Sequence, residues 1–272
     1  MKKIIALVMA AAMLLALCAC GAKAPAASAE ASASASASAS AGEAVVLNTV
    51  EAGKLHMSTN AAFPPYEMVA DDGTFEGIDV EVAAAIAAKL GLELVVDDMG
   101  FDAALEAAQS GKSDIVMAGV SVTEARKEVM DFTDKYTTAV QVIIVKEDSA
   151  IASVDDLAGA DMIGCQAATT GYIYCSDDYG EDKVTAYDNG AAAVMALVNG
   201  QVDAVVIDSA PAEEYVKANP GLKILDTEYV EEEYAIGLAK NSELTEAVNG
   251  ALAELIADGT VQSIIDTYIV AE

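Results

Sequence analysis

Arg126 is the only arginine in a chain of 272 residues whose formal net charge is -30. It follows the apolar segment "DIVMAG" and lies within "VSVTEARKE", where Ser121 and Glu124 fit the capping box S-x-x-E and predict a helix that begins near Thr123. Arg126 is therefore expected in the first helical turn. Because the start of a helix carries partial positive charge and favours anions, a ligand explains a cation at this place better than the helix does.

Small and polar residues surround this guanidinium in the sequence. Ala118 and Gly119 leave room for a ligand to approach the backbone, and Ser121 offers a hydroxyl group. The planar fork of Arg126 matches a carboxylate through two parallel hydrogen bonds. The segment is therefore a candidate receptor for the carboxylate of a small molecule.

A second group of polar residues lies in the other half of the chain. Asp208 ends the apolar segment "AVVID", and "QAATTGY" places Gln166, Thr169 and Thr170 in a loop that leads to a helix N-terminus. Asp208 suits an ammonium group, whereas Arg126 suits a carboxylate. Together they describe a receptor for an α-amino acid.

Each charged residue also has a simpler explanation. Arg126 could form a surface ion pair with Glu128 or Asp131, and Asp208 could cap a helix that begins before Pro211. Capping by Asp208 is compatible with ligand binding.

Alternating strands and helices from Val45 onward predict an α/β fold. Asp79 is expected to cap the first helix, Gly91 to end it, and Gly259 to interrupt the last helical segment. Strands are expected at 54–60, 92–98, 114–119, 161–166, 203–208 and 233–240, and helices at 79–91, 102–112, 191–200, 210–221 and 242–269.

An internal repeat indicates two lobes. Segments 105–119 and 194–208 both run from a helix through a glycine and an aspartate into an apolar strand, so that Gly119 and Asp208 occupy matching strand ends. Ligands of open α/β sheets bind beyond these carboxyl ends. We expect lobe 1 at 44–140 plus 231–272 and lobe 2 at 141–230. Two crossings, at 137–141 and 230–235, would form a hinge.

The N-terminus has the layout of a secretory signal, with Lys2 and Lys3 before an apolar run that ends near Cys20. We expect a signal peptide at 1–19 and, because Leu17, Cys18 and Ala19 resemble a lipobox, a lipid carrying acyl chains such as palmitate on Cys20. Modification of Cys18 is less favoured, and a signal peptide without lipidation is the alternative. Residues 20–43, with the tract "ASASASASAS", are expected to be a flexible tether.

Composition excludes several other functions. A net charge of -30 argues against binding nucleic acid or anionic lipid by charge. The four cysteines lack paired spacing, and the single His56, expected in a strand without a role, cannot complete a metal site with them. Cys165 and Cys175 could form a disulfide in an exported protein. The acidic run "EYVEEEY" at 228–234 is expected to be a solvated strand edge or hinge rim.

Five motifs together resemble the extracellular solute-binding proteins of ABC transporters for polar amino acids, from about Lys54 to the C-terminus. They are "NAAFPPYE", "GIDVEVAAAIAAKLG", "FDAALEAAQSGKSDIVMAGVSVTEARKEVMDFTDKY", "GCQAATTG" and "NGQVDAVVID". The resemblance implies a two-lobed periplasmic-binding-protein-like fold that closes on its ligand. It also implies a monomer anchored outside the cell membrane or in the periplasm, which delivers an amino acid to a permease and its ATPase and performs no chemistry on it.

The resemblance further implies which residues hold the ligand. Arg126 would bind the α-carboxylate and Asp208 the α-ammonium, while Phe63 and Phe101 would sandwich the side chain. The remaining members of the cage would be Asn60 and Gln166 at the border of the side chain, with Ala118, Gly119, Ser121, Thr169 and Thr170 around the polar groups.

Two positions depart from the pattern of the family. Asn60 stands where relatives that bind cationic side chains often carry Asp, so that glutamine as well as arginine is a possible ligand, and Ala168 replaces a glycine of the carboxylate loop. Two other classes of function stay open at this point. One is a dehydratase-like enzyme on the same fold with Glu67 or Asp208 as general acid, and the other is a module that senses amino acids.

Overall fold

A computed structural model describes residues 47–269, which belong to one compact unit, Val45–Glu272. The signal peptide, the lipid on Cys20 and the tether that the sequence predicts all lie outside the described residues. Most of the strands form one nine-stranded sheet with the order β5-β1-β6-β12-β7-β10-β8-β9, in which β11 also pairs with β7. No helix of residues 47–269 is long and apolar enough to cross a membrane.

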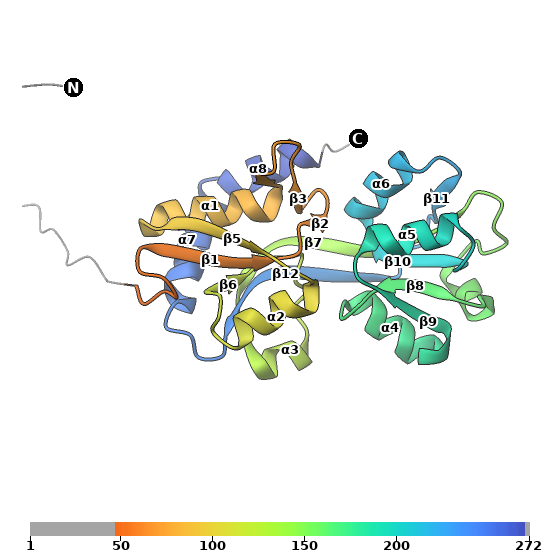
Figure 1. Ribbon diagram of the computed structural model, residues 1–272, viewed down its shortest axis with the longest axis horizontal. Helices are drawn as coiled ribbons and strands as arrows, with labels where there is room; N and C mark the ends of the chain where they lie inside the picture. The colour runs from red at the N-terminus through yellow and green to blue at the C-terminus, as the bar shows by residue number, and fades with distance from the viewer. Residues whose placement is uncertain (1–46, 270–272) are drawn as a thin grey trace, which may run out of the picture. The chain divides into compact units, whose positions relative to one another are not determined.

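Lobe 1 contains the parallel strands β1 (Lys54–Thr59), β5 (Glu93–Asp98) and β6 (Ile115–Val116). A small antiparallel sheet of β2 (Ala62–Phe63), β3 (Glu67–Val69) and β4 (Phe75–Glu76) adjoins them. The helices of this lobe, drawn in Figure 1, are α1 (Ile78–Leu90), α2 (Phe101–Gln109), α3 (Glu124–Val129), α7 (Thr245–Ala257) and α8 (Thr260–Tyr268).

Lobe 2 contains β8 (Ile163–Gln166), β9 (Val184–Tyr187) and β10 (Ala204–Asp208), which pair in parallel, and the short strand β11 (Leu222–Ile224). Its helices are α4 (Thr170–Tyr179), α5 (Gly190–Val198) and α6 (Ser209–Ala218), with single 3₁₀ turns at Val154–Gly159 and Glu181–Lys183. Cys165 and Cys175 lie fully buried in the core between α4 and the sheet, as free thiols.

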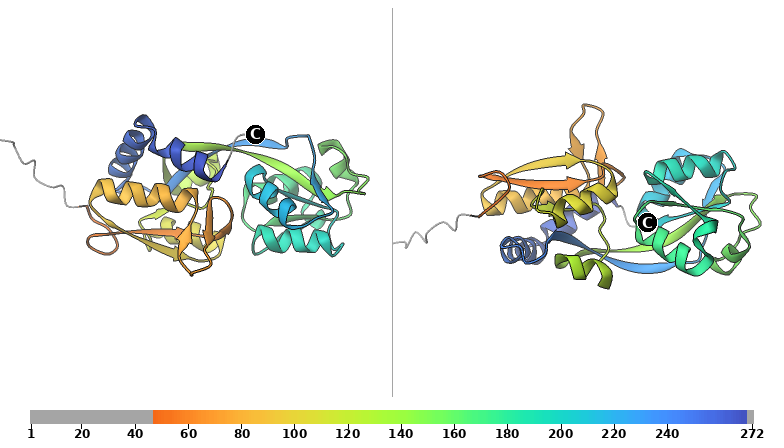
Figure 2. Two further views of the ribbon diagram at one scale, coloured as in Figure 1. Left: turned by 90° about the horizontal axis from the view of Figure 1, so that it is seen from above. Right: turned by 60° about the horizontal axis from the view of Figure 1, so that its bottom comes forward.

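Two long strands connect the lobes (Figure 2). β7 (Met130–Lys146) and β12 (Val230–Ala239) pair antiparallel, and β7 continues into lobe 2, where it pairs with β10. Gln141 lies where these ladders meet, because it is paired with Val230 on one side and with Asp208 on the other. The expected crossings at 137–141 and 230–235 therefore fall within this two-stranded connection. The register of the pair shifts at Tyr234 and Ala235.

The strands and helices expected from the sequence are present, and α1 ends at Gly91 in the left-handed conformation (φ 70°), as predicted. Two predicted caps are wrong. The N-cap of α1 is Gly77, so that Asp79 lies inside the first turn with a buried side chain. The N-cap of α3 is Thr123, whose side chain accepts a hydrogen bond from the backbone N–H of Arg126, and Ser121 lies outside the helix.

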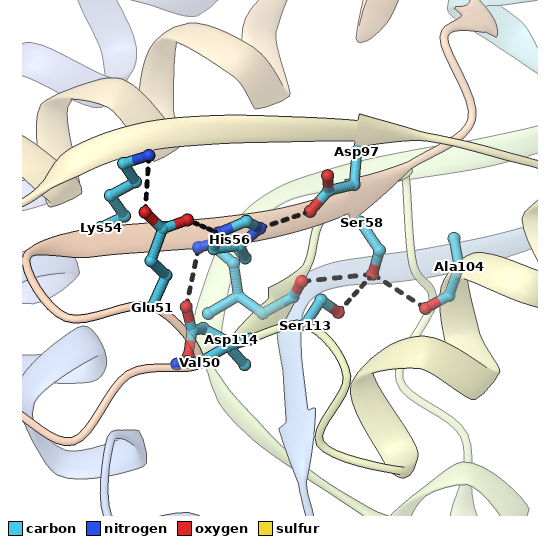
Figure 3. A network of polar contacts seen from close by, with 10 residues as sticks. Val50, Glu51, Lys54, His56, Ser58, Asp97, Ala104, Ser113 and Asp114 are labelled. Carbon is cyan, nitrogen blue, oxygen red and sulfur yellow. Dashed lines mark hydrogen bonds and ion pairs between the residues drawn. The ribbon is translucent and has the colours of Figure 1, made fainter.

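His56 has polar partners that its sequence context did not indicate (Figure 3). Its Nδ1 lies 2.7 Å from Oδ2 of Asp97 on β5, and its Nε2 lies 3.4 Å from Oε2 of Glu51. Asp114 accepts the backbone N–H groups of His56 at 2.7 Å and of Val50 at 2.8 Å. This network fixes the segment that leads into β1 to the edge of lobe 1.

Candidate functional site

One small cavity between the lobes collects the residues that the sequence singled out. All eleven predicted ligand-binding residues line it, together with Glu67, although they come from both lobes. The lining consists of Asn60, Phe63, Glu67, Phe101, Ala118, Gly119, Ser121, Arg126, Gln166, Thr169, Thr170 and Asp208. Arg126 is the sole basic side chain of this lining.

Arg126 is buried, with 9% of its surface exposed, and points away from the acidic residues next to it in the sequence. Its Nη1 donates to the backbone oxygen of Ser121 at 2.8 Å and its Nη2 to that of Ala168 at 3.2 Å. The guanidinium carbon lies 5.5 Å from the centroid of the Phe101 ring. In the described part of the chain no carboxylate lies within 4 Å of Arg126, and Asp131 pairs with Lys240 instead. The alternative of a surface ion pair is therefore wrong.

Burial removes water from this guanidinium, and the loss of solvation lowers the pKa of Arg126 from its ordinary value. A buried cation without a counter-ion is costly unless an anion joins it. The arrangement therefore favours binding of an anionic group in the cavity, next to the guanidinium of Arg126.

Asp208 ends β10 and occupies the N-cap position of α6, yet its side chain forms no capping hydrogen bond. Its Oδ2 accepts from Nε2 of Gln141 at 3.3 Å, and its Oδ1 has no hydrogen-bond partner among residues 47–269. Burial raises the pKa of Asp208 to about 7. A cation beside Asp208 would favour its ionised form.

Glu232 was expected on a solvated rim, and this expectation is wrong. Its side chain is 6% exposed, and its Oε2 accepts from Ser121 at 2.9 Å, from Thr170 at 2.9 Å and from Gln141 at 3.0 Å. The carboxylate thus ties a hydroxyl of lobe 1 to a hydroxyl of lobe 2. The sequence signal that could have revealed it is the spacing of two residues between Glu232 and the aromatic Tyr234. In a strand this spacing puts both side chains on the same face, which is the buried one in β12.

Glu67 is the lining residue that the sequence did not assign to ligand binding. It is fully buried, and no donor among residues 47–269 reaches either carboxyl oxygen, while its carboxyl group lies within hydrogen-bonding range of that of Asp79. Burial, followed by the charge of Asp79, raises the pKa of Glu67 well above its ordinary value. A buried acceptor left without a donor points to a missing polar partner.

Asp79, which lies on α1, supports the part of the cavity wall that Gly119 forms. Its Oδ2 accepts the backbone N–H of Gly119 at 2.9 Å, and its Oδ1 accepts the hydroxyl of Tyr136 at 2.7 Å. Burial raises its pKa to about 6. Asp79 therefore positions the 118–121 segment rather than the end of its own helix.

Aromatic rings form two walls of the cavity. Phe63 and Phe101 are 7% and 6% exposed, and the Phe63 ring stacks on that of Tyr66 with 5.7 Å between centroids. Gly119 has a φ of 56°, and a Cβ built on it would come within 2.9 Å of the Phe63 ring. A larger residue at 119 would therefore displace the wall.

Direct contacts between the lobes surround the cavity. Nε2 of Gln166 donates to Oδ1 of Asn60 at 3.0 Å, and Nδ2 of Asn60 donates to the backbone oxygen of Met99 at 2.9 Å. The lobes are thus closed on each other in this structure. Ala168 adopts the left-handed conformation (φ 62°) that glycine favours, so the loop keeps a glycine-like shape without a glycine.

A profile of the bacterial extracellular solute-binding proteins, family 3, matches residues 55–271. The chain belongs to this family. Solute-binding family 3 is a family of binding proteins and not of enzymes, which sets aside the dehydratase-like alternative.

Similar proteins bind amino acids according to their names. The chain is 32% identical over 238 residues to a probable histidine-binding protein of Neisseria gonorrhoeae, covering 85% of this chain and 89% of that protein. It is 35% identical over 228 residues to the arginine-binding extracellular protein ArtP of Bacillus subtilis, covering 80% and 87%. Among solved structures, the arginine-, lysine-, histidine-binding protein ArtJ of Geobacillus stearothermophilus aligns with a TM-score of 0.76 at 35% identity, over 80% of this chain and 96% of ArtJ.

Proposed function

We propose that this family 3 protein captures an amino acid by closing its two lobes and delivers it to the permease and ATPase of an ABC importer. The observation that carries the proposal is the placement of Arg126 and Asp208, one from each lobe, in the same buried cavity. Arg126 would receive the α-carboxylate with Ser121 and Thr170, and Asp208 the α-ammonium. Phe63 and Phe101 would enclose the side chain, and the remaining lining residues would complete the polar cage.

The ligand is proposed to be a basic amino acid, with arginine as the first candidate. The cavity lining holds two carboxyl groups, Glu67 and Asp208, against one guanidinium, which complements a ligand with two positive charges and one negative charge. Asn60 carries no charge, and its amide oxygen already accepts from Gln166. Glu67, with both oxygens unpartnered, would therefore receive the cationic end of the side chain. Relatives named for arginine and histidine support this choice.

The location of the protein follows from the sequence and the family. We propose that residues 1–19 direct export, that Cys20 carries the lipid anchor, and that the monomeric receptor works at the outer face of the membrane on a tether formed by residues 20–43.

A ligand screen followed by a variant tests the proposal. Melting temperatures would be measured with each of the twenty amino acids, ornithine and cystine, since a ligand that binds the folded state raises the melting temperature. L-arginine is expected to give one of the largest shifts. Replacement of Arg126 by Ala is expected to weaken L-arginine binding by about 2 to 5 kcal/mol, the cost of breaking a desolvated charged pair.

The neighbouring residue provides a matched control. Lys127 follows Arg126 on α3 but is exposed and pairs with Glu124 at 2.8 Å, so Lys127→Ala should leave the affinity unchanged. Equal affinities of the Arg126→Ala and Lys127→Ala variants would exclude Arg126 as the carboxylate receptor. If no compound in the screen shifts the melting temperature, the proposed amino-acid ligand is wrong.

A further inference from the structure

Four side-chain hydrogen bonds join lobe 1 to lobe 2 directly in the described chain, apart from those made by the crossing strands β7 and β12. Three of them involve residues that line the cavity, namely Asn60 with Gln166, Arg126 with the oxygen of Ala168, and Ser121 with Thr170. The fourth joins the hydroxyl of Tyr215 on α6 to the backbone oxygen of Ala62 on β2 at 2.8 Å. Neither Tyr215 nor Ala62 lines the cavity.

Tyr215 is held in place from its own lobe. It is 9% exposed, and its ring lies against the first residue of α5, where a Cβ built on Gly190 would come within 3.1 Å of the ring and 3.3 Å of the hydroxyl. The hydroxyl therefore reaches across the interface from a fixed ring, and little side-chain freedom is lost when the hydrogen bond forms.

Ala62 connects this contact to the ligand cage. It precedes Phe63, a wall of the cavity, and its backbone N–H donates to the backbone oxygen of Asn60 at 2.6 Å. The Tyr215 contact can form only when lobe 2 has closed on the segment that carries Asn60 and Phe63. It thus stabilises the closed arrangement at a point that the ligand does not reach.

We propose that the hydrogen bond from Tyr215 to Ala62 is an interlobe latch, and that Tyr215 is a positioning residue that increases ligand affinity without touching the ligand. A contact present only in the closed state raises the closed population, and the apparent affinity falls in proportion when that population falls. The proposal rests on ligand capture by lobe closure as proposed above.

The test replaces Tyr215 by Phe in the full-length protein, which keeps the ring and removes the hydroxyl. Because a neutral hydrogen bond contributes modestly, Tyr215→Phe is expected to raise the Kd for L-arginine about two- to tenfold, with the change mainly in the dissociation rate. The matched control is Tyr229→Phe, whose hydroxyl donates to Asp178 within lobe 2 at 2.5 Å. The control should leave the Kd unchanged.

A second measurement needs no ligand. Spin labels at Val69→Cys in lobe 1 and Met195→Cys in lobe 2, which are 51% and 48% exposed, report the distance between the lobes in a protein with Cys18 and Cys20 changed to Ser. In the ligand-free protein, Tyr215→Phe is expected to increase the population at longer distance, and Tyr229→Phe is not. A loss of melting temperature without a change in distance would indicate a merely structural role and overturn the latch.

The two measurements separate this proposal from the proposed function. If the unsubstituted protein does not bind L-arginine, that ligand is wrong, and the label distances alone decide about the latch. If the protein binds L-arginine and the Tyr215→Phe and Tyr229→Phe variants agree in both Kd and distance, the latch is wrong although the proposed function stands.

Discussion

Glu67 and Glu232 are both buried carboxyl groups, Glu67 in the lining of the cavity and Glu232 behind the lining residues Ser121 and Thr170, but their surroundings differ. Glu232 accepts three hydrogen bonds through one oxygen, whereas both oxygens of Glu67 lack a donor within residues 47–269. A buried group with donors around it stabilises the closed arrangement, and one without them costs free energy until a ligand supplies the donor. Glu232 therefore has a structural role, and the contrast supports the proposal that Glu67 recognises the ligand.

Replacement of Glu67 by Gln tests this assignment. The change keeps the shape and removes the charge, so the affinity for L-arginine is expected to fall by about 2 to 4 kcal/mol, while that for L-glutamine should fall less. Since burial raises the pKa of Glu67, binding of a cation should release a proton, and the affinity for L-arginine should rise more steeply with pH in the unsubstituted protein than in the variant, in which only Asp208 still titrates beside the ligand.

Calorimetry at several pH values measures both effects. The matched control is Glu76→Gln on the exposed part of β4, which belongs to the same small sheet as Glu67 and should change neither affinity. If Glu67→Gln leaves the ratio of the two affinities unchanged, Glu67 does not contact the side chain of the ligand.

Ala168 allows a prediction about stability. An L-residue other than glycine costs about 1 to 2 kcal/mol in the left-handed conformation, part of which the greater chain entropy of glycine offsets. Ala168→Gly is therefore expected to stabilise the protein by about 0.5 to 1 kcal/mol and to raise its melting temperature by roughly 1 to 4 °C. The preceding Ala167 has no positive φ, so Ala167→Gly should lower the melting temperature. Equal shifts of the two variants would contradict the strain at Ala168.

At the scale of elements, the edge of lobe 1 contains the only histidine of the chain. The polar network of Figure 3 joins the segment before β1 to β5 through His56, Glu51 and Asp97. The hydrogen bond to Asp97 raises the pKa of His56, although burial opposes it. Charging of His56 therefore strengthens the attachment of this segment.

The pH dependence of unfolding tests the network. A raised pKa in the folded state contributes stability that is complete below about pH 6.5, the ordinary pKa of histidine, and is lost as the pH rises through the folded value. Between pH 6 and pH 8.5, the unsubstituted protein should lose up to about 1 kcal/mol relative to His56→Gln, because the partly exposed Asp97 limits the effect.

The same experiment with Asp97→Asn is the control. That variant lacks the first cause of the raised pKa and should show the weaker pH dependence of His56→Gln. Unfolding curves in denaturant at each pH provide the free energies. Parallel profiles for all three proteins would show that His56 does not titrate in this network.

At the scale of the whole molecule, the sequence predicted the site better than it predicted the contacts that support it. Arg126, Gly119 and Asp208 were predictable because strand ends of an α/β sheet converge, and the structure places all three in the lining of one cavity. Local rules failed where a residue found a distant partner. Ser121 was expected to cap a helix, but its hydroxyl donates to Glu232, which is 111 residues away along the chain.

Burial of the acidic residues was equally beyond the reach of local rules. Asp79 was expected at a helix N-terminus, yet it accepts hydrogen bonds from Gly119 and Tyr136, which lie 40 and 57 residues away along the chain. The charge of Glu67 and Glu232 predicts exposure, yet both side chains are buried. Sequence patterns describe single elements, whereas these contacts arise from tertiary structure.

The antiparallel pair of β7 and β12 has a mechanical consequence. Because the two strands run from one lobe into the other as a continuous ribbon, the lobes can separate by bending and twisting this ribbon while its ladder of backbone hydrogen bonds stays intact. Opening then requires the loss of only the few side-chain contacts between the lobes, at the cavity and at Tyr215. Release of the ligand therefore does not require either lobe to unfold, and the receptor can open and close through many cycles of capture.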